Sequence, residues 1–452
     1  MHCKGGPMKV DTYLSMLLEN NKIDPELYAK YNVKRGLRNA DGTGVLVGLT
    51  RVGDVHGYII DENERIAVDG KLYYRGIDVE DIVRYVQEEH RYGFEETVYL
   101  LMFGQLPTKE QLEEFNDFLA EHRHLPDNFA EDAIMKAPSP DIMNKLARSV
   151  LTCYAYDPNP EDLSYENVLR QCLELIARFP TMVAYAYVAK KHYYDHESLF
   201  IHTPEKLSST AETILSLIRP DKKFTSLEAE ILDLALILHA EHGGGNNSTF
   251  AVHLISSADT DTYSVIAAGV GSLKGFKHGG ANIKVMGMME DIKRGVKNWE
   301  DEDEVAAYLI KILKGEAFDR TGLIYGQGHA VYTKSDPRAT LLRDKAAELA
   351  KEKGFEKEFN LYRTIEKLVP IVFKQVKGAD KSICTNVDFY SGFVYHMLGI
   401  PGELYTPLFA VSRVAGWCAH RMEEIISGGK IIRPAYKCVQ PRLPYVPMAE
   451  RK

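Results

Sequence analysis

The sequence contains no pair of cysteines separated by two residues. Its six cysteines are scattered along the chain, at Cys3, Cys153, Cys172, Cys384, Cys418 and Cys438. Closely spaced pairs are typical of zinc sites, thioredoxin-type motifs and secreted disulfide frameworks, so all three are disfavoured. We therefore expect a protein of a reducing compartment, with a cytoplasmic location.

Long apolar runs are absent as well. The longest extends from Ile231 to Leu238 and is interrupted by Asp233, whereas a bilayer-spanning helix needs about 20 apolar residues. The N-terminal region has no apolar signal core and is too acidic for a typical organellar presequence. Its acidic residues are Asp11, Glu19, Asp24 and Glu26. We expect neither a membrane span nor a membrane partner.

The chain has too few basic residues for a nucleic-acid-binding protein. It carries 55 Lys and Arg against 64 Asp and Glu, a net charge of −9. This sign repels a phosphate backbone, so nucleic acid is not expected as a partner. An anionic substrate must therefore be bound by a local cluster of arginine and histidine.

Helical periodicity, in contrast, is abundant. The composition of the 452-residue chain, 45% apolar and 26% charged, is that of a folded globular protein. Apolar residues from Leu227 to His239, preceded by a capping box of Thr225 and Glu228, predict a buried helix. Further helices are predicted over Tyr165–Phe179, Met182–Lys190, Glu304–Leu313 and Leu341–Ala350, the first two separated by a break at Pro180.

A small β-meander near residues 43–74 is the exception to this helical pattern. Its predicted strands, rich in β-branched and aromatic residues, are Val45–Leu49, Val55–Ile60 and Lys71–Tyr74. Farther along, the charge-rich stretch from Glu290 to Lys381 predicts a separate smaller lobe. Histidine- and glycine-rich segments lie on either side of it, and a cleft between lobes would bring them together around a small molecule.

The first such segment runs from His239 to Ser248 and contains three consecutive glycines. Glycines after a helix end it and allow the backbone to approach a ligand. His242 is then a histidine satisfied within a helix C-terminus, a metal ligand paired with His239, or a ligand-binding residue. The His-Glu-x-x-His motif of zinc proteases is not present.

The second segment runs from Gly269 to Asn282. Its Gly-x-Gly-x-x-x-Gly pattern is similar to a dinucleotide fingerprint, but Tyr263–Val270 predicts a helix where that motif requires a strand. A P-loop is excluded because no Gly-Lys-Ser or Gly-Lys-Thr follows. His278 is predicted at the start of a helix, where the dipole disfavours its cationic form and leaves a neutral hydrogen-bond donor.

Three more segments contain candidate charged residues. His329 is flanked by glycine and followed by an Asp-Pro-Arg338 turn, which could equally be a surface turn. Asp388 lies in an apolar and aromatic neighbourhood, where burial would raise its pKa toward that of a useful base; a helix-capping Asp is the alternative. Arg413 and Arg433 are either solvated or ligand-binding.

Together, these segments resemble the citrate synthase family. The matching residues, in the family's order, are the His242 segment, His278-Gly279, Gly-Gln-Gly-His329, Asp-Pro-Arg338, Asn-Val-Asp388 with Ser391-Gly392, Ser-Arg413 and Arg433-Pro434. The resemblance extends from Tyr74-Arg75-Gly76 to Arg433-Pro434. It implies an all-α fold in which a large helical domain, residues 1–279 and 384–452 with the minor β-meander, is closed by a small domain, residues 280–383.

The resemblance also implies a reaction and a role for each residue. Acetyl-CoA condenses with oxaloacetate and citryl-CoA is hydrolysed to citrate and CoA, the activity of an Si-type acyltransferase. Asp388 takes the methyl proton, His278 stabilises the enolate and His329 protonates the ketone. The residues implied to hold oxaloacetate are His242, Arg338, Arg413 and Arg433.

The remaining expectations concern partners. Lys334 and Lys277 are candidate contacts for the phosphates of coenzyme A. A homodimer is implied, in which Arg433 of the partner subunit reaches the site, and neither a metal nor a bound cofactor is needed.

Three alternatives stay open from the sequence alone. A 2-methylcitrate synthase would use propionyl-CoA, and one added methylene changes selectivity by only about 1–3 kcal/mol. A nicotinamide-dependent oxidoreductase would depend on the glycines that begin at Gly269. A non-catalytic binding protein would keep the fold without the chemistry, and the joint presence of Asp388, His278 and His329 speaks against it.

Overall fold

The computed structural model describes residues 10–39, 41–61, 64–206, 209–329, 331–378 and 383–451. The chain divides into two compact units, Met1–Leu49 and Thr50–Lys452. The described part of the first unit forms α1 (Val10–Asn20), α2 (Glu26–Lys30) and the 3₁₀ turn η1 (Arg35–Leu37). An isolated antiparallel bridge joins Arg38 to Gly44.

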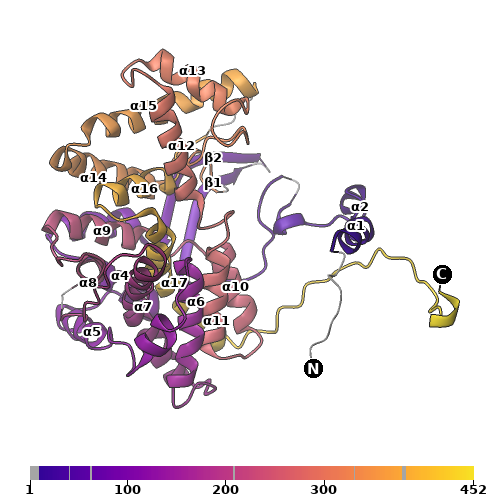
Figure 1. Ribbon diagram of the computed structural model, residues 1–452, viewed down its shortest axis with the longest axis horizontal. Helices are drawn as coiled ribbons and strands as arrows, with labels where there is room; N and C mark the ends of the chain where they lie inside the picture. The colour runs from indigo at the N-terminus through magenta and orange to yellow at the C-terminus, as the bar shows by residue number, and fades with distance from the viewer. Residues whose placement is uncertain are drawn as a thin grey trace. The chain divides into compact units, whose positions relative to one another are not determined.

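The second unit is built almost entirely of helices (Figure 1). The helices before the charge-rich stretch are α3 (Val79–Glu88), α4 (Phe94–Phe103), α5 (Lys109–Glu121), η2 (Ala130–Met135), α6 (Ile142–Cys153), η3 (Tyr154–Tyr156), α7 (Tyr165–Tyr194), α8 (Thr210–Ile218), α9 (Ser226–His239), α10 (Asn247–Ser256) and α11 (Thr262–Leu273). Those that follow are α12 (Ala281–Gly295), α13 (Glu302–Leu313), α14 (Pro337–Lys353), α15 (Glu356–Lys377), α16 (Val387–Met397), η4 (Gly402–Leu404), α17 (Tyr405–Ile426) and η5 (Met448–Glu450). In Figure 1, α12, α13, α14 and α15 gather at the top of the view. The predicted all-α fold is confirmed.

Most of the predicted helices are present. α9 begins with the expected capping box, in which Thr225 accepts from the amide of Glu228 and the Glu228 carboxylate accepts from the amide of Thr225. α13 matches its prediction, and α14 is longer because it begins at Pro337, directly after the N-cap Asp336.

The predicted helix break at Pro180 is wrong. α7 is a single helix of 30 residues that continues through Pro180. Residues on both sides of the proline are buried, so the packing of both halves outweighs the backbone hydrogen bond that proline cannot donate. By length and composition α7 could cross a membrane, but 78% of its apolar window is buried within the protein, as in a core helix.

The sheet has three antiparallel strands, β1 (Gly53–Asp61), β2 (Glu64–Tyr74) and β3 (Ile77–Asp78), in the order β1-β2-β3. Two of the three predicted strands are therefore confirmed. Val45–Leu49 is not a strand: the amide of Val45 donates to the carbonyl of Leu37 at 2.9 Å, but no ladder continues from it among the described residues, and Leu46 is 85% and Leu49 90% exposed. The register of β1 and β2 shifts between His56 and Tyr58.

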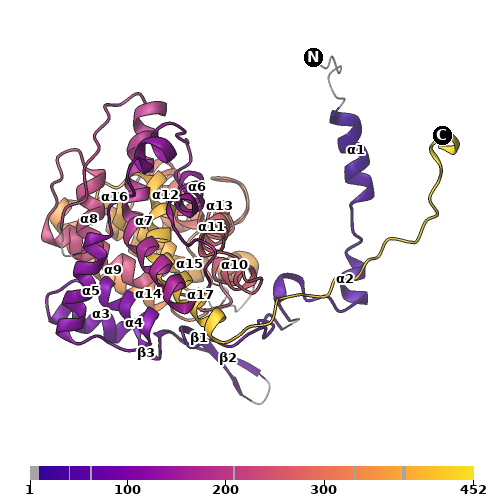
Figure 2. The same ribbon diagram turned by 90° about the horizontal axis from the view of Figure 1, so that it is seen from below.

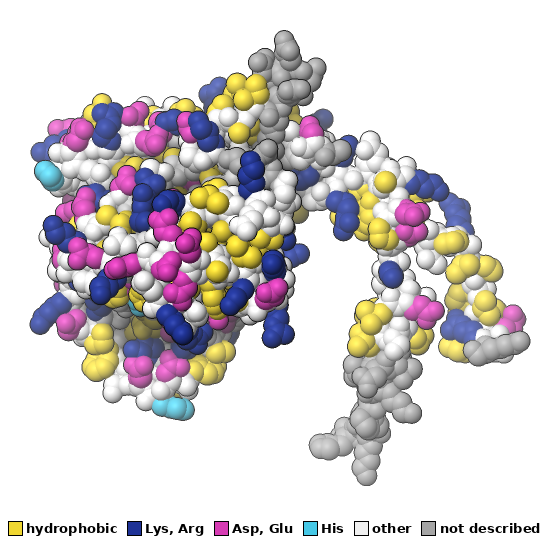
Figure 3. Space-filling view, turned by 90° about the horizontal axis from the view of Figure 1, so that it is seen from above, with side chains coloured by type: hydrophobic (Ala, Val, Ile, Leu, Met, Phe, Trp, Pro, Cys, Tyr) yellow, Lys and Arg dark blue, Asp and Glu magenta, His cyan; other side chains and the backbone are white. Residues whose placement is uncertain are grey.

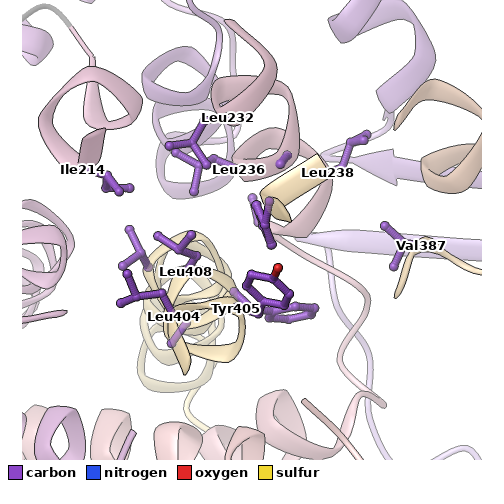
Figure 4. Packing of buried hydrophobic residues seen from close by; sticks show 14 of the residues in the cluster. Ile214, Leu232, Leu236, Leu238, Val387, Leu404, Tyr405 and Leu408 are labelled. Carbon is purple, nitrogen blue, oxygen red and sulfur yellow. The ribbon is translucent and has the colours of Figure 1, made fainter. Parts of the chain in front are cut away.

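The hydrophobic core of the second unit includes the side chains shown in Figure 4. Leu232 and Leu236 of α9 pack there with Leu404 and Leu408, at the start of α17 (Figure 4). Every residue of α17 from Tyr405 to Met422 is buried. The polar residues in that stretch must therefore find partners inside the protein.

The surface carries charges of both signs. On the face shown in Figure 3, basic and acidic side chains are interspersed over the helical body.

One prediction tests the packing of α17. Gly416→Ala would place Cβ 2.3 Å from Glu241 Oε2 and 2.5 Å from the carbonyl oxygen of Ala240. A backbone oxygen has little room to retreat, so we expect the free energy of unfolding to fall by about 1–3 kcal/mol. Gly271→Ala in α11 is the matched control: a Cβ there meets nothing within 4 Å, and stability should rise by up to about 1 kcal/mol. Denaturant unfolding measures both changes, and a Gly416→Ala protein as stable as wild type would contradict the packing.

Candidate active site

Asp388 lies in the first turn of α16 with its carboxyl group free for chemistry. The helix cap is Asn386, whose Oδ1 accepts from the amide of Asp388 at 3.0 Å. The capping alternative for Asp388 is therefore wrong. Burial raises the pKa of Asp388 to about 6; Asp336 raises it further, while Arg338 and Arg413 oppose the shift. A carboxylate with this pKa is a suitable general base near neutral pH.

Asp336 brings Arg338 and Asp388 together. Its two carboxylate oxygens accept from Nε and Nη2 of Arg338, at 3.0 and 2.8 Å. The same carboxylate caps α14 and accepts from the amide of Val387 at the start of α16. The two helices therefore begin side by side. The predicted surface turn at Asp-Pro-Arg is wrong, because Pro337 and Arg338 are buried and form the first turn of α14.

Arg413 provides a buried guanidinium with an unused fork. The residue is 0% exposed and its Nε donates to the carbonyl oxygen of His239 at 2.7 Å. Neither Nη1 nor Nη2 has a hydrogen-bond partner among the described residues. Burial lowers the pKa of Arg413 to about 10, so the group stays cationic at neutral pH. Buried N–H donors without hydrogen-bond partners are costly, which indicates a site built for an anion.

His242 lies near the guanidinium groups of Arg338 and Arg413, which both act on its ring. Its ring is 5.1 Å from that of His329 and 5.7 Å from that of Tyr332, centroid to centroid. Burial, followed by Arg338 among its charged neighbours, holds the pKa of His242 well below its usual value. Its Nε2 is buried without a protein partner among the described residues. This histidine is therefore neutral and available to a ligand, rather than satisfied within the helix terminus.

His239 does not form the metal site considered from its spacing with His242. In the part of the chain that the structure describes, neither residue belongs to a cluster of three metal-ligating side chains. His239 is buried against Phe409, with a ring distance of 4.4 Å.

The ring of His329 is oriented by its own loop. Its Nδ1 accepts from the amides of Val331 and Tyr332, at 3.0 and 3.1 Å. In the neutral ring the proton is therefore on Nε2, which makes Nε2 a donor. The sheet packs closely on this loop, since a Cβ at Gly57 would lie 2.5 Å from the carbonyl oxygen of Val331.

His278 is held by a serine hydroxyl that the sequence did not single out. Its Nε2 lies 3.0 Å from Oγ of Ser248, and Nε1 of Trp417 donates to the same Oγ at 3.1 Å. Burial and the charge of Arg413 lower the pKa of His278 to about 4, so the ring is neutral at pH 7. The residue precedes α12 by three positions, and burial is the main cause of its neutrality.

Three predicted site residues lie outside this cluster. Arg433 is exposed on the extended segment after α17, which runs away from the helical body (Figure 2). Lys277 is exposed beside His278, and Lys334 is exposed and paired with Asp69 at 3.1 Å. A cavity of about 620 Å³ elsewhere in the described part of the chain is lined by other residues, among them Arg51 and Arg75.

The structure thus gathers a carboxyl group of raised pKa, neutral imidazoles and two buried guanidinium groups. This combination defines an acid–base enzyme that binds a small dianion. A dinucleotide site is ruled out, because Gly269 and Gly271 lie inside α11 and the described strands are antiparallel.

Comparisons with known proteins agree with this class. The model of the family "Citrate synthase, C-terminal domain" matches residues 42–435. The chain is 33% identical to a citrate synthase of Haloferax volcanii over 405 residues, 88% of this chain and 98% of the relative. It is 32% identical to a 2-methylcitrate synthase of Shewanella oneidensis over 389 residues, 85% and 94% of the two chains.

Solved structures agree as well. Citrate synthase of Pyrobaculum aerophilum matches with a TM-score of 0.73 and 30% identity, over 90% of this chain and 94% of that one. A ternary complex of citrate synthase from Thermoplasma acidophilum matches with a TM-score of 0.74 and 27% identity, over 93% and 99%. The chain belongs to the citrate synthase family.

The unused fork of Arg413 generates a binding prediction. Arg413→Gln should weaken the binding of oxaloacetate by about 10- to 100-fold, because a charge-assisted bidentate contact is lost. Arg421→Gln is the matched control, since Arg421 is also fully buried on α17 and its Nη2 donates to the carbonyl of Thr260. That variant should cost stability and leave binding unchanged. Calorimetric titration decides, and equal binding by wild type and Arg413→Gln would contradict the assignment.

Proposed function

We propose that this protein condenses acetyl-CoA with oxaloacetate and hydrolyses the resulting citryl-CoA to citrate and CoA. One observation carries the proposal. The fork of Arg413 is buried and unpaired among the described residues, and Arg413 and Arg338 both act on the carboxyl group of Asp388. Relatives named citrate synthase support it. So does the Thermoplasma structure, which is described as a complex with oxaloacetate and carboxymethyl coenzyme A.

Oxaloacetate is a dianion, and the two buried arginines supply matching charge. Arg413 offers both Nη groups to one carboxylate. Arg338 is held rigid by Asp336, which limits the side-chain entropy lost when substrate binds. Nε2 of His242 is a further contact for the carboxylate or the ketone. Substrate binding thus satisfies polar atoms that have no partner among the described protein groups.

Proton transfer from the acetyl methyl group then needs a base and an oxyanion donor together. Asp388 takes the proton, and neutral His278 donates to the thioester oxygen as the enol or enolate forms. The contact with Ser248 fixes the ring of His278 in place. The nucleophile is the methyl carbon.

The carbon–carbon bond forms when this carbon attacks the ketone carbon of oxaloacetate. Nε2–H of His329 donates its proton to the ketone oxygen, which becomes a hydroxyl group. Water then cleaves the C–S bond of citryl-CoA, releasing the CoA thiol and a new carboxylate.

We further infer that the protein works as a cytoplasmic homodimer, with Arg433 of the partner subunit completing each site. Arg433 is exposed on the segment that follows α17, which supports a role in a neighbouring site. Free, buried cysteines at positions 153, 172, 384 and 418 support a reducing compartment. Lys277, exposed beside His278, and Lys334 are proposed contacts for CoA phosphates.

A second candidate is 2-methylcitrate synthesis from propionyl-CoA, which relatives of similar identity support by their names. Release of free CoA from acetyl-CoA and from propionyl-CoA, each with and without oxaloacetate, tests both. We expect oxaloacetate-dependent release with a higher kcat/KM for acetyl-CoA. A preference for propionyl-CoA would select the second candidate, and no release from either would reject both.

Asp388→Asn tests the base. We expect kcat to fall by about 10²–10⁴-fold with the fold unchanged, whereas Asp344→Asn, an exposed carboxyl on α14, should leave it unchanged. Because the base acts in its ionised form, kcat/KM of wild type should fall as the pH drops below about 6, the pKa of Asp388. Thiol release followed against pH measures this, and a profile that stays flat down to pH 5 would argue against Asp388 as the base.

A further inference from the structure

Two histidines that the proposed reaction does not use face each other behind the active site. Nε2 of His253, on α10, lies 3.0 Å from Nδ1 of His420, on α17. The outer nitrogens meet carboxylates: Nε2 of His420 is 3.0 Å from Oε1 of Glu241, and Nδ1 of His253 is 2.7 Å from Oε2 of Glu424. The two rings therefore join one carboxylate to another through three contacts.

These contacts fix the number of protons on the two rings. An ionised carboxylate only accepts, so each outer nitrogen must carry a hydrogen. The inner pair of nitrogens, one on each ring, needs one more hydrogen between them, or two lone pairs would face each other. Two neutral imidazoles hold two hydrogens in total, whereas this arrangement requires three. The pair therefore carries one positive charge.

The charged side chains around the two rings are consistent with one positive charge on the pair. The carboxylates that face the pair are Glu241, Glu424 and Glu423, the last with Oε2 3.7 Å from Nδ1 of His420. The cations that act on this group are Arg413, through Glu241, and Arg75, through Glu241 and Glu423. The histidine pair thus lies among three carboxylates, which favours the positive charge that the hydrogen count requires.

The pKa values of the two rings agree with this count. Although burial opposes it, Glu241 and Glu423 raise the pKa of His420 to about 9. Burial and the neighbouring His420 lower the pKa of His253. One ring of the pair is charged at neutral pH, and the other is not.

Glu241 connects this charge to the active site. The residue is 0% exposed and directly precedes His242, and its Oε1 also accepts from the amide of Gly243. Close contacts hold it in place, since a Cβ at Gly53 would lie 2.7 Å from its Cγ. Two turns before His420 on the same helix, Arg413 holds the carbonyl of His239. α17 thus holds both ends of the segment that carries His242.

We propose that His253 and His420 share one proton as a buried cation, and that this cation holds Glu241 and thereby positions His242 for oxaloacetate. Both histidines are positioning residues, since they act through Glu241 rather than on the substrate. The inference deepens the proposed function and rests on it for its kinetic readout.

A shared proton predicts a non-additive pair of substitutions. Glutamine has an NH2 group that donates and a carbonyl oxygen that accepts, so it can bridge the same neighbours while the remaining histidine keeps the charge. His253→Gln and His420→Gln should therefore each change KM for oxaloacetate by no more than about threefold. The double variant has no cation, and its KM for oxaloacetate should rise by about tenfold or more. KM for acetyl-CoA should change little in all three. His202→Gln, which alters a histidine that contacts the carbonyls of Arg219 and Pro220, is the control.

Additive effects of the two single substitutions would overturn the proposal, because a packing role predicts additivity. The pH dependence is a second readout. The proton is bound below about pH 9 and lost above it, so KM for oxaloacetate should rise in wild type above that pH and stay flat to pH 9.5 in the double variant. Arg413 titrates higher, near pH 10.

Histidine NMR on ¹⁵N-labelled wild type keeps the proposal testable if the double variant does not fold. One imidazole of the pair should remain in its cationic form, with hydrogens on both nitrogens, until about pH 9. Each single variant should lose the resonances of one ring. Two rings that are both neutral at pH 7 would overturn the proposal, whatever the protein catalyses. If no acyl-CoA is turned over, the proposed function fails, and this titration still decides the shared proton.

The spectra also distinguish a proton from a metal ion in the same place. Treatment with EDTA, and separately with Zn²⁺ at equal concentration to the protein, should leave the wild-type histidine resonances unchanged. Resonances of His253 and His420 that depend on the chelator would overturn the proposal in favour of a bound metal.

Discussion

The site depends on a buried guanidinium whose fork has no hydrogen-bond partner among the described residues. Arg413 is enclosed by the core, with one nitrogen bonded to a backbone carbonyl and the fork left open. Burial and this positive charge also set the pKa values of the neighbouring polar groups. His242 and His278 are kept neutral, while the pKa of Asp388 is raised by burial and held back by the arginines. The substrate supplies the missing negative charge, so binding and the preparation of the acid–base groups are coupled.

Helix α17 is the element that makes such burial possible. It supplies Arg413 to the anion, Trp417 to the serine behind His278, and His420 to Glu241. A single helix that is buried along most of its length can hold these groups at fixed spacing with little side-chain freedom. Asp336 does the same from the opposite side, by bridging the starts of α14 and α16.

How much of this was readable from the sequence depends on whether the signal is local. The capping box at Thr225 is local and predicted α9 correctly, and the residues gathered in the site carry strong motifs. The predictions at Pro180 and at Val45–Leu49 were wrong because tertiary packing determines the structure at both places. Packing on both sides of Pro180 keeps α7 continuous, whereas Val45–Leu49 has no partner strand among the described residues. Asp336 had a local signal, an aspartate before proline at a helix start. Ser248, Trp417 and His420 had none, since their roles arise from contacts between segments far apart in the chain.

The histidine pair illustrates why a titratable cation suits its place better than a third arginine. A guanidinium has five N–H donors, all of which must be satisfied when it is buried. Near Glu241 the two rings lie between the carboxylates of Glu241 and Glu424, and they satisfy both with three hydrogens and one charge. A fixed cation would leave buried donors unpaired, as Arg413 does. At Arg413 that deficit is met by substrate; beside Glu241 there is no substrate to meet it, and the shared proton removes the need.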